Sequence, residues 1–155
     1  MTKRAFARRR IGFLPDESNN TPYTMIATTL PATPPTLQEI FDTVVAHLRE
    51  QKVKCSDGHG CLYRSDYPGQ ACAVGCLIPD SLYHRGLEAL GIYNLFAAEE
   101  IPEFFAAYGI ASNEDPAFKL LSDFQDLHDN TDPVAWESAF RNLAFFRTLT
   151  YNEPR

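Results

Sequence analysis

The sequence predicts an α+β fold that is mainly α-helical, with one β-hairpin packed on about five helices and an irregular N-terminal arm. Two observations favour helices: apolar residues recur at helical spacing after residue 36, and Asp-Pro pairs stand where helices should start. Alternation and dense turn signals within residues 61–74 predict the hairpin. A chain of 155 residues is most simply one domain. We therefore expect an arm over residues 1–35 and a single globular domain over residues 36–155.

The arm is basic at first and then rich in proline and threonine. Five of the fourteen Lys and Arg side chains stand in residues 3–10. Residues 1–35 show no apolar period, which is typical of irregular structure. Met25 stands shortly before the first helix, so the sequence leaves open whether residues 1–24 belong to the functional protein.

The first helix is predicted over residues 36–51. Thr36 and Glu39 have the spacing of a capping box, in which each side chain accepts a hydrogen bond from the other residue's backbone N–H. One face of this helix is apolar and carries Leu37, Ile40, Phe41, Val44 and Leu48. A polar, glycine-containing loop then leads to the hairpin, whose strands are expected at residues 61–64 and 70–74.

The later helices are predicted from start and stop signals. Helices are expected at residues 79–90, 93–98 and 101–109. Two more should start at the pairs Asp115-Pro116 and Asp132-Pro133, and the last should run to about residue 149. Their inner faces carry Leu120, Leu121, Phe124, Leu127 and His128 in one helix and Trp136, Phe140 and Leu143 in the other.

The hairpin carries the residues that we expect to bind a partner. Tyr67 lies in its turn, Arg64 precedes the turn, and Tyr63 and Tyr83 are near in sequence. Arg and Tyr are frequent in the hot spots of protein interfaces, and both stack on bases or rings. The alternative is that Arg64 only pairs with Asp66 while Tyr67 lies over the hairpin.

The cysteines allow a second interpretation, a structural zinc site. Its ligands would come from Cys55, His59, Cys61, Cys72 and Cys76. Common zinc sites place two residues between paired cysteines, whereas three separate Cys72 from Cys76. Free cysteines are also among the most buried residues, so no cofactor is the main expectation and zinc the alternative.

A third interpretation is a hydrolase with a thiol nucleophile. Cys76 shortly precedes a predicted helix start, where the helix dipole would lower the pKa of its thiol. His128 with Asp129, or His47, would supply the base. The sequence has no local nucleophile signature beyond these residues, so we expect binding rather than catalysis.

Charge and composition exclude several classes of function. Eighteen of the twenty Asp and Glu side chains stand from Met25 onward, so general nucleic-acid binding by the folded domain is not expected. No apolar run is long enough for a bilayer. Arg9-Arg10 lacks the apolar segment of an export signal, which predicts a cytoplasmic protein. Aromatic residues exceed the needs of a small core, and Phe145-Phe146 in particular indicates a partner surface or a homo-oligomer.

The segment C-L-Y-R…C-A-V-G-C-L-I-P-D, which begins at Cys61, resembles an uncharacterised family of small phage and prophage-associated bacterial proteins. The likeness extends to residues 36–48 and to L-x5-L-H-D at residues 121–129. The family has no agreed activity, so the resemblance implies no catalytic residues. It implies an intracellular accessory protein that counters host defence.

Together these observations predict a small cytoplasmic accessory protein that acts by binding. The expected partner is a host protein or a small nucleotide-like ligand. A structural zinc-binding protein and a Cys–His hydrolase remain the alternatives.

Overall fold

The computed structural model describes residues 26–27 and 29–155, and this part of the chain is mainly helical, as predicted. Its five α-helices are α1 (Leu37–Gln51), α2 (Ile92–Ala97), α3 (Pro102–Ala107), α4 (Pro116–Asn130) and α5 (Trp136–Arg147). Three short 3₁₀ helices are η1 (Gly75–Leu77), η2 (Arg85–Ala89) and η3 (Pro133–Ala135). The predicted basic part of the arm lies outside the described residues.

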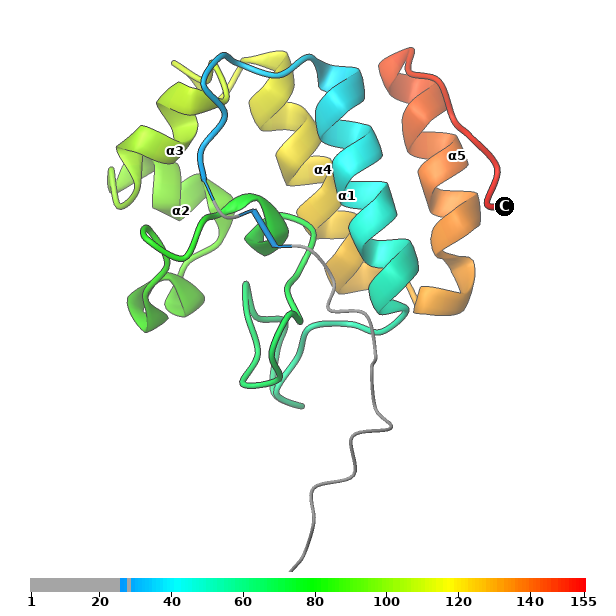
Figure 1. Ribbon diagram of the computed structural model, residues 1–155, viewed down its shortest axis with the longest axis horizontal. Helices are drawn as coiled ribbons and strands as arrows, with labels where there is room; N and C mark the ends of the chain where they lie inside the picture. The colour runs from blue at the N-terminus through cyan, green and yellow to red at the C-terminus, as the bar shows by residue number, and fades with distance from the viewer. Residues whose placement is uncertain (1–25, 28) are drawn as a thin grey trace, which may run out of the picture.

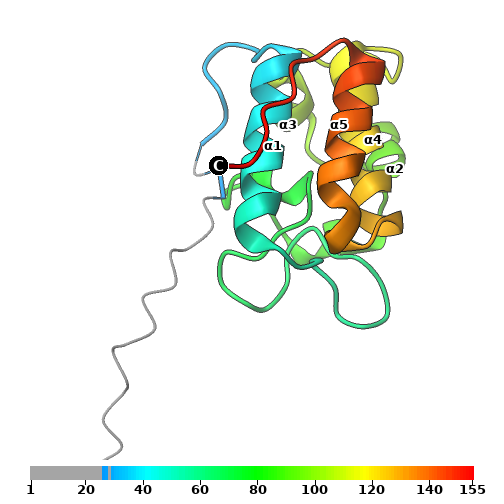
Figure 2. The same cartoon turned by 90° about the vertical axis from the view of Figure 1, so that its right-hand side faces the viewer.

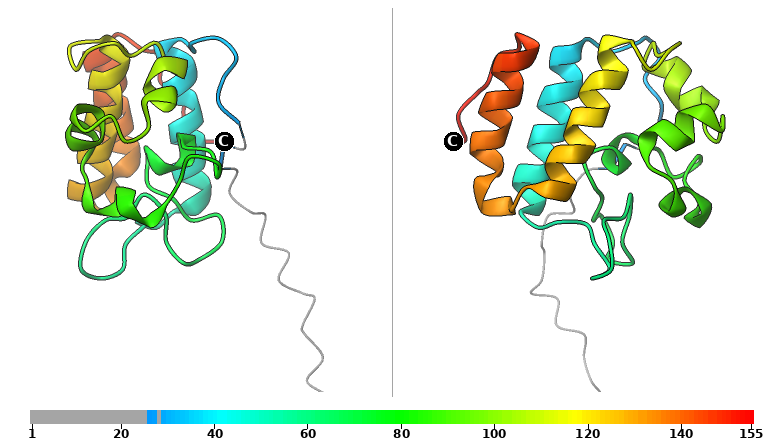
Figure 3. Two further views of the ribbon diagram at one scale, coloured as in Figure 1. Left: turned by 90° about the vertical axis from the view of Figure 1, so that its left-hand side faces the viewer. Right: turned by 180° about the vertical axis from the view of Figure 1, so that it is seen from behind.

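The three long helices α1, α4 and α5 lie side by side, with α2 and α3 on the other side of α4 (Figures 1 and 3). Helix α4 packs against α1, α2 and α5, so it is the centre of the core. The ring of Phe124 lies 5.6 Å from that of Phe41 in α1. Phe118, six residues nearer the start of α4, contacts the ring of Phe105 in α3. Aromatic side chains therefore join the helices on both sides of α4.

Local signals placed most helix ends correctly. The Glu39 carboxylate accepts the Thr36 N–H at 2.7 Å, and the Thr36 hydroxyl accepts the Glu39 N–H at 3.2 Å, which confirms the capping box. Gly109 follows α3 with a φ of +70°, the left-handed conformation in which glycine is favoured. These ends depend on residues close together in sequence, which is why the sequence predicts them.

The predicted β-hairpin is wrong. The described residues contain no β-strand, and the segment holds two isolated antiparallel bridges, Ser56 with Cys61 and Arg64 with Ala71. The predicted strands at residues 61–64 and 70–74 therefore meet at one bridge without forming a ladder. The fold class is helical, with an irregular loop where the hairpin was expected.

The physical reason is competition for backbone groups. A hairpin pairs its N–H groups with carbonyls of the opposite strand. Here the N–H groups of Tyr63 and Arg64 donate to the carboxylate of Glu88, and that of Ala71 donates to the amide oxygen of Gln51. Side chains that are distant in sequence thus take the place of a strand.

The helix predicted at residues 79–90 is also wrong. The N–H groups of Leu82 and Tyr83 both donate to the carbonyl of Pro79, which closes a turn. His84 is then extended, with φ −146° and ψ 158°, so the helix cannot continue. Only the short 3₁₀ helix η2 follows, and it turns Glu88 toward the irregular loop.

Two segments without regular structure pack along the helices. Gln38 of α1 exchanges two hydrogen bonds with the backbone of Thr150, and Arg49 donates to the carbonyl of Asn152, so the C-terminal segment runs beside α1 (Figure 2). Near the start of the described chain, the N–H of Ala27 donates to the carbonyl of Cys76 at 2.8 Å. The end of the arm is irregular, as predicted, yet it contacts the core.

Candidate functional site

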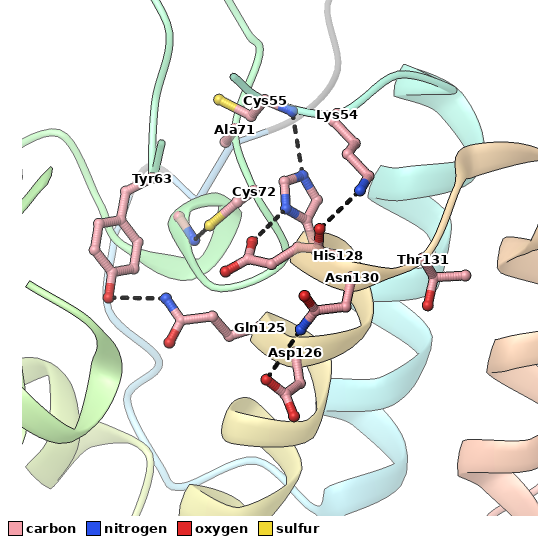
Figure 4. A network of polar contacts seen from close by, with 12 residues as sticks. Lys54, Cys55, Tyr63, Ala71, Cys72, Gln125, Asp126, His128, Asn130 and Thr131 are labelled. Carbon is pink, nitrogen blue, oxygen red and sulfur yellow. Dashed lines mark hydrogen bonds and ion pairs between the residues drawn. The ribbon is translucent and has the colours of Figure 1, made fainter. Parts of the chain in front are cut away.

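The cysteine loop, residues 52–74, lies at the end of the bundle where α1 and α4 finish (Figure 1). Side chains of both helices hold its backbone. His47 Nε2 of α1 donates to the carbonyl of Ala71 at 3.0 Å, and His128 Nε2 of α4 accepts the N–H of Cys55 at 3.2 Å (Figure 4). Burial is the main cause that lowers the pKa of the His47 side chain. Both histidines are buried parts of the scaffold that positions this loop.

Glu88 of η2 fixes the centre of the loop. Its carboxylate accepts the N–H of Tyr63 at 2.6 Å, the N–H of Arg64 at 3.0 Å and the hydroxyl of Tyr83 at 2.7 Å. A carboxylate offers about four acceptor positions, and Glu88 uses two of them for backbone N–H groups of the loop and one for Tyr83. This residue therefore determines how residues 63–64 enter the core.

A polar cavity of about 230 Å³ lies between the cysteine loop, η2 and α4. It is lined by Cys61, Leu62, Tyr63, Cys72, Glu88, Ala89, Leu90, Gly91, Gln125 and Asp129. Gln125 crosses from α4, accepts the Ile92 N–H and donates to the Tyr63 hydroxyl at 3.2 Å (Figure 4). The cavity thus combines two carboxylates, an amide and a phenol with two thiols.

Cys61, His128 and Asp129 come together at one edge of this cavity, with their polar atoms within 4.8 Å of one another. The Nδ1 atom of His128 lies 3.1 Å from the Asp129 carboxylate. Because a backbone N–H can only donate, the N–H of Cys55 makes Nε2 of His128 an acceptor. Nδ1 then carries the ring proton, and this N–H donates a hydrogen bond to the Asp129 carboxylate. Neither ring nitrogen is then free to accept a proton from a thiol.

The thiols are also poor nucleophiles. Burial first, and then the hydrogen bond and charge of Asp129, raise the pKa of the Cys61 thiol to about 11. Burial raises the pKa of Cys76 to about 12, and its S–H donates to the carbonyl of Ala73. Cys76 lies in the short helix η1, not before an α-helix, so no long helix dipole acts on it. The structure brings His128 and Asp129 together, as the hydrolase interpretation requires, but the thiol beside them is that of Cys61 and not that of Cys76.

The same tautomer limits metal binding. A zinc ion on Nδ1 of His128 would require that nitrogen to lose its proton while Nε2 still accepts the Cys55 N–H. The ring would become an imidazolate, so the three residues do not fit a zinc site as they are placed. Asp129 and Cys61 alone leave too few ligands for a tetrahedral ion.

The other residues considered for zinc point to different places. Cys55 is buried and its S–H donates to the carbonyl of Gln70. Cys72 is buried and its sulfur accepts the N–H of Gly75 at 3.2 Å. His59 is exposed, at the tip of a turn closed by Asp57. Of the five predicted ligands, the described residues bring only Cys61 into a group of three potential ligands.

Three of the four predicted binding residues are occupied inside the protein. Tyr63 is buried beneath the loop. The guanidinium of Arg64 pairs with Asp80, donates to a carbonyl and lies 4.8 Å from the centre of the Tyr83 ring. Tyr67 is 74% exposed and is the one of the four that projects into solvent.

The two most exposed rings among the described residues are on α5. Phe145 and Phe146 are 79% and 78% exposed, and their ring centres lie 5.8 Å apart in an edge-to-face arrangement. Neighbouring helix residues point in directions about 100° apart, so one buried stripe cannot include both. The expectation that this pair is surplus to the core is confirmed.

Comparisons with protein-family models, with curated proteins and with solved structures give no match for this chain. Within residues 26–155, apart from residue 28, none of the helices combines the length and the apolar character that crossing a membrane requires.

Proposed function

We propose that this protein binds another protein through the outer face of α5, with Phe145 and Phe146 as the central contacts. The observation that carries the proposal is the exposure of two adjacent large aromatic side chains, 79% and 78%, on a well-formed helix. Exposed aromatic side chains in contact with each other are typical of interface centres.

The energy available at this surface is substantial. Full burial of one phenylalanine side chain contributes about 1.5–3 kcal/mol, so the pair supplies about 3–6 kcal/mol when a partner covers it. The rings already contact each other, and both are on a helix. Little conformational entropy is then lost on binding, which favours their role as hot spots.

The surroundings of Phe146 indicate the chemistry of the partner. A hollow of about 370 Å³ lies beside the ring and is lined by Asp123, Asp126, Leu143, Phe146 and Arg147. Arg147 pairs with Asp123, whereas Asp126 is exposed. A partner that inserts an apolar side chain here and carries a basic residue next to it complements both the rings and Asp126.

Binding also agrees with the chemistry of the cysteine loop. Burial raises the pKa of its thiols Cys55, Cys61 and Cys72, and the ring of His128 is engaged on both sides, so the loop offers no activated nucleophile. The proposal keeps the cytoplasm as the compartment and a host protein as a compatible partner, and a second copy of the chain is the competing occupant.

Replacement of both phenylalanines by serine tests the proposal. The double variant Phe145→Ser/Phe146→Ser should lose proteins that the wild-type chain captures from a cytoplasmic lysate, and its affinity for the purified partner should fall at least about 100-fold. Its melting temperature should stay close to that of the wild type, since both side chains are exposed. Affinity is measured by isothermal titration calorimetry.

Two controls make the experiment specific. Val134→Ser removes an exposed apolar side chain from η3 and should leave capture unchanged. Tyr67→Ser removes the exposed ring of the cysteine loop. Capture that survives the double variant but is lost with Tyr67→Ser would move the binding surface to the loop and overturn the proposal. Light scattering of the isolated chain identifies self-association, the other occupant.

A further inference from the structure

We infer that the cavity beneath the cysteine loop is a binding site for a small cationic group, a guanidinium or primary ammonium that carries several N–H donors. This site is separate from the proposed partner surface. The residues that line the cavity do not line the hollow beside Phe146, although Asp126 of that hollow lies one turn before Asp129 on α4. The helix ends themselves, that of α4 near Asp129 and that of α5 near the two phenylalanines, lie at opposite ends of the bundle (Figure 1). The two proposals can therefore fail independently.

The wall of the cavity is made mostly of acceptors. It includes the carboxylates of Asp129 and Glu88, the amide of Gln125 and the hydroxyl of Tyr63. Of the side-chain donors, the Gln125 amide donates to the Tyr63 hydroxyl, and the Cys61 thiol lies within 4.8 Å of the Asp129 carboxylate. A ligand that brings N–H donors finds partners here, whereas an anion would meet two carboxylates.

Asp129 is the principal anchor. His128 Nδ1 and the Cys61 thiol use part of its acceptor capacity, and a carboxylate retains further lone pairs. Hydrogen bonds from His128 and Cys61 act against burial, and the net effect lowers the pKa of Asp129, which keeps it charged at neutral pH. Glu88 has less capacity left, because it already accepts three hydrogen bonds.

The nearby cations do not fill the site. Lys54 donates to the backbone carbonyl of Asp129 at 2.8 Å and is not among the residues that line the cavity. Arg64 lies close to Glu88 but is engaged by Asp80 and by the Tyr83 ring. No Lys or Arg lines the cavity among the described residues, so its two carboxylates have no cationic side chain inside it.

The volume limits the ligand. A cavity of about 230 Å³ holds the equivalent of about seven water molecules and is smaller than the usual site for a drug-sized molecule. A nucleotide is too large for it and carries the wrong charge. A guanidinium with a short alkyl tail fits, and its planar set of donors can reach Asp129 and Gln125 together.

The test uses two ligands of the same shape and different charge. Propylguanidinium and neutral propylurea are titrated into the full-length protein, and the backbone amides of residues 61, 125 and 129 are followed by NMR. We expect saturable shifts with propylguanidinium and binding of propylurea that is at least ten-fold weaker. Equal affinities, or no saturation with propylguanidinium up to about 10 mM, would overturn the inference.

Two variants locate the site. Asp129→Asn retains an oxygen that accepts from His128 but removes the charge, and it should weaken propylguanidinium binding at least ten-fold. Glu100→Gln, at an exposed position that lines neither this cavity nor the hollow beside Phe146, should change the affinity less than two-fold. Near-ultraviolet circular dichroism checks that both variants keep the fold. Zinc chloride is titrated in parallel, and tight binding of zinc that blocks propylguanidinium would assign the site to a metal instead.

Discussion

Gly75→Ala should destabilise the protein by about 3 kcal/mol, at the upper end of the usual cost of overpacking. A Cβ atom on residue 75 would lie 1.9 Å from the carbonyl oxygen of Tyr63 and 2.7 Å from its carbonyl carbon. These are backbone atoms, which cannot move aside as a flexible side chain can. The Tyr63 backbone is fixed on both sides, because its N–H donates to Glu88 and its carbonyl accepts the N–H of Cys72.

Gly60→Ala is the matched control. Residue 60 is in the same loop, and a Cβ atom there meets no heavy atom within 4 Å. Urea unfolding followed by circular dichroism should show a much lower midpoint for Gly75→Ala and a midpoint close to the wild-type value for Gly60→Ala. Equal midpoints for the two variants would mean that Gly75 does not lie against Tyr63.

Glu88→Ala should have the second largest effect, a loss of about 3 kcal/mol in the free energy of unfolding. The variant removes a charged acceptor from two backbone N–H groups and from the Tyr83 hydroxyl, and hydrogen bonds to charged groups contribute about 1.5–3 kcal/mol each. Solvent that enters the emptied space recovers part of the loss, so the sum is smaller than three full bonds.

Glu88→Gln separates charge from shape. One oxygen remains as an acceptor and the other becomes an NH₂ donor that faces the same N–H groups, so we expect an intermediate loss of stability. Glu100→Ala, at an exposed position, should change stability by less than about 0.5 kcal/mol. A Glu88→Ala variant as stable as Glu100→Ala would show that the loop does not depend on this carboxylate.

The helices could be predicted because their signals are local. The capping box of Thr36 and Glu39 and the Asp-Pro start of α4 lie within a few residues of the elements they begin. The cysteine loop could not be predicted in this way. Its alternating pattern is typical of a hairpin. However, the backbone N–H groups that a hairpin would pair donate instead to Glu88, which is 24 or 25 residues away, and to Gln51, which is 20 residues away.

The candidate site was predicted in part. The pair His128 and Asp129 was identified, since adjacent residues at a helix end are readily recognised, but the thiol beside them is Cys61 and not Cys76. Gln125 was missed. The sequence shows only a polar residue about one turn before His128 on the predicted helix. Its role depends on the hydrogen bond to Tyr63, which is distant in sequence.

Amide hydrogen exchange tests most directly whether side chains of α1, α4 and η2 fix the cysteine loop. The N–H groups of Cys55, Tyr63, Arg64 and Ala71 all donate to such side chains. We predict that these four amides exchange only through global unfolding, whereas that of Gly58, in the exposed turn, exchanges rapidly. Exchange of all five amides at the rate of an unprotected chain would contradict the account.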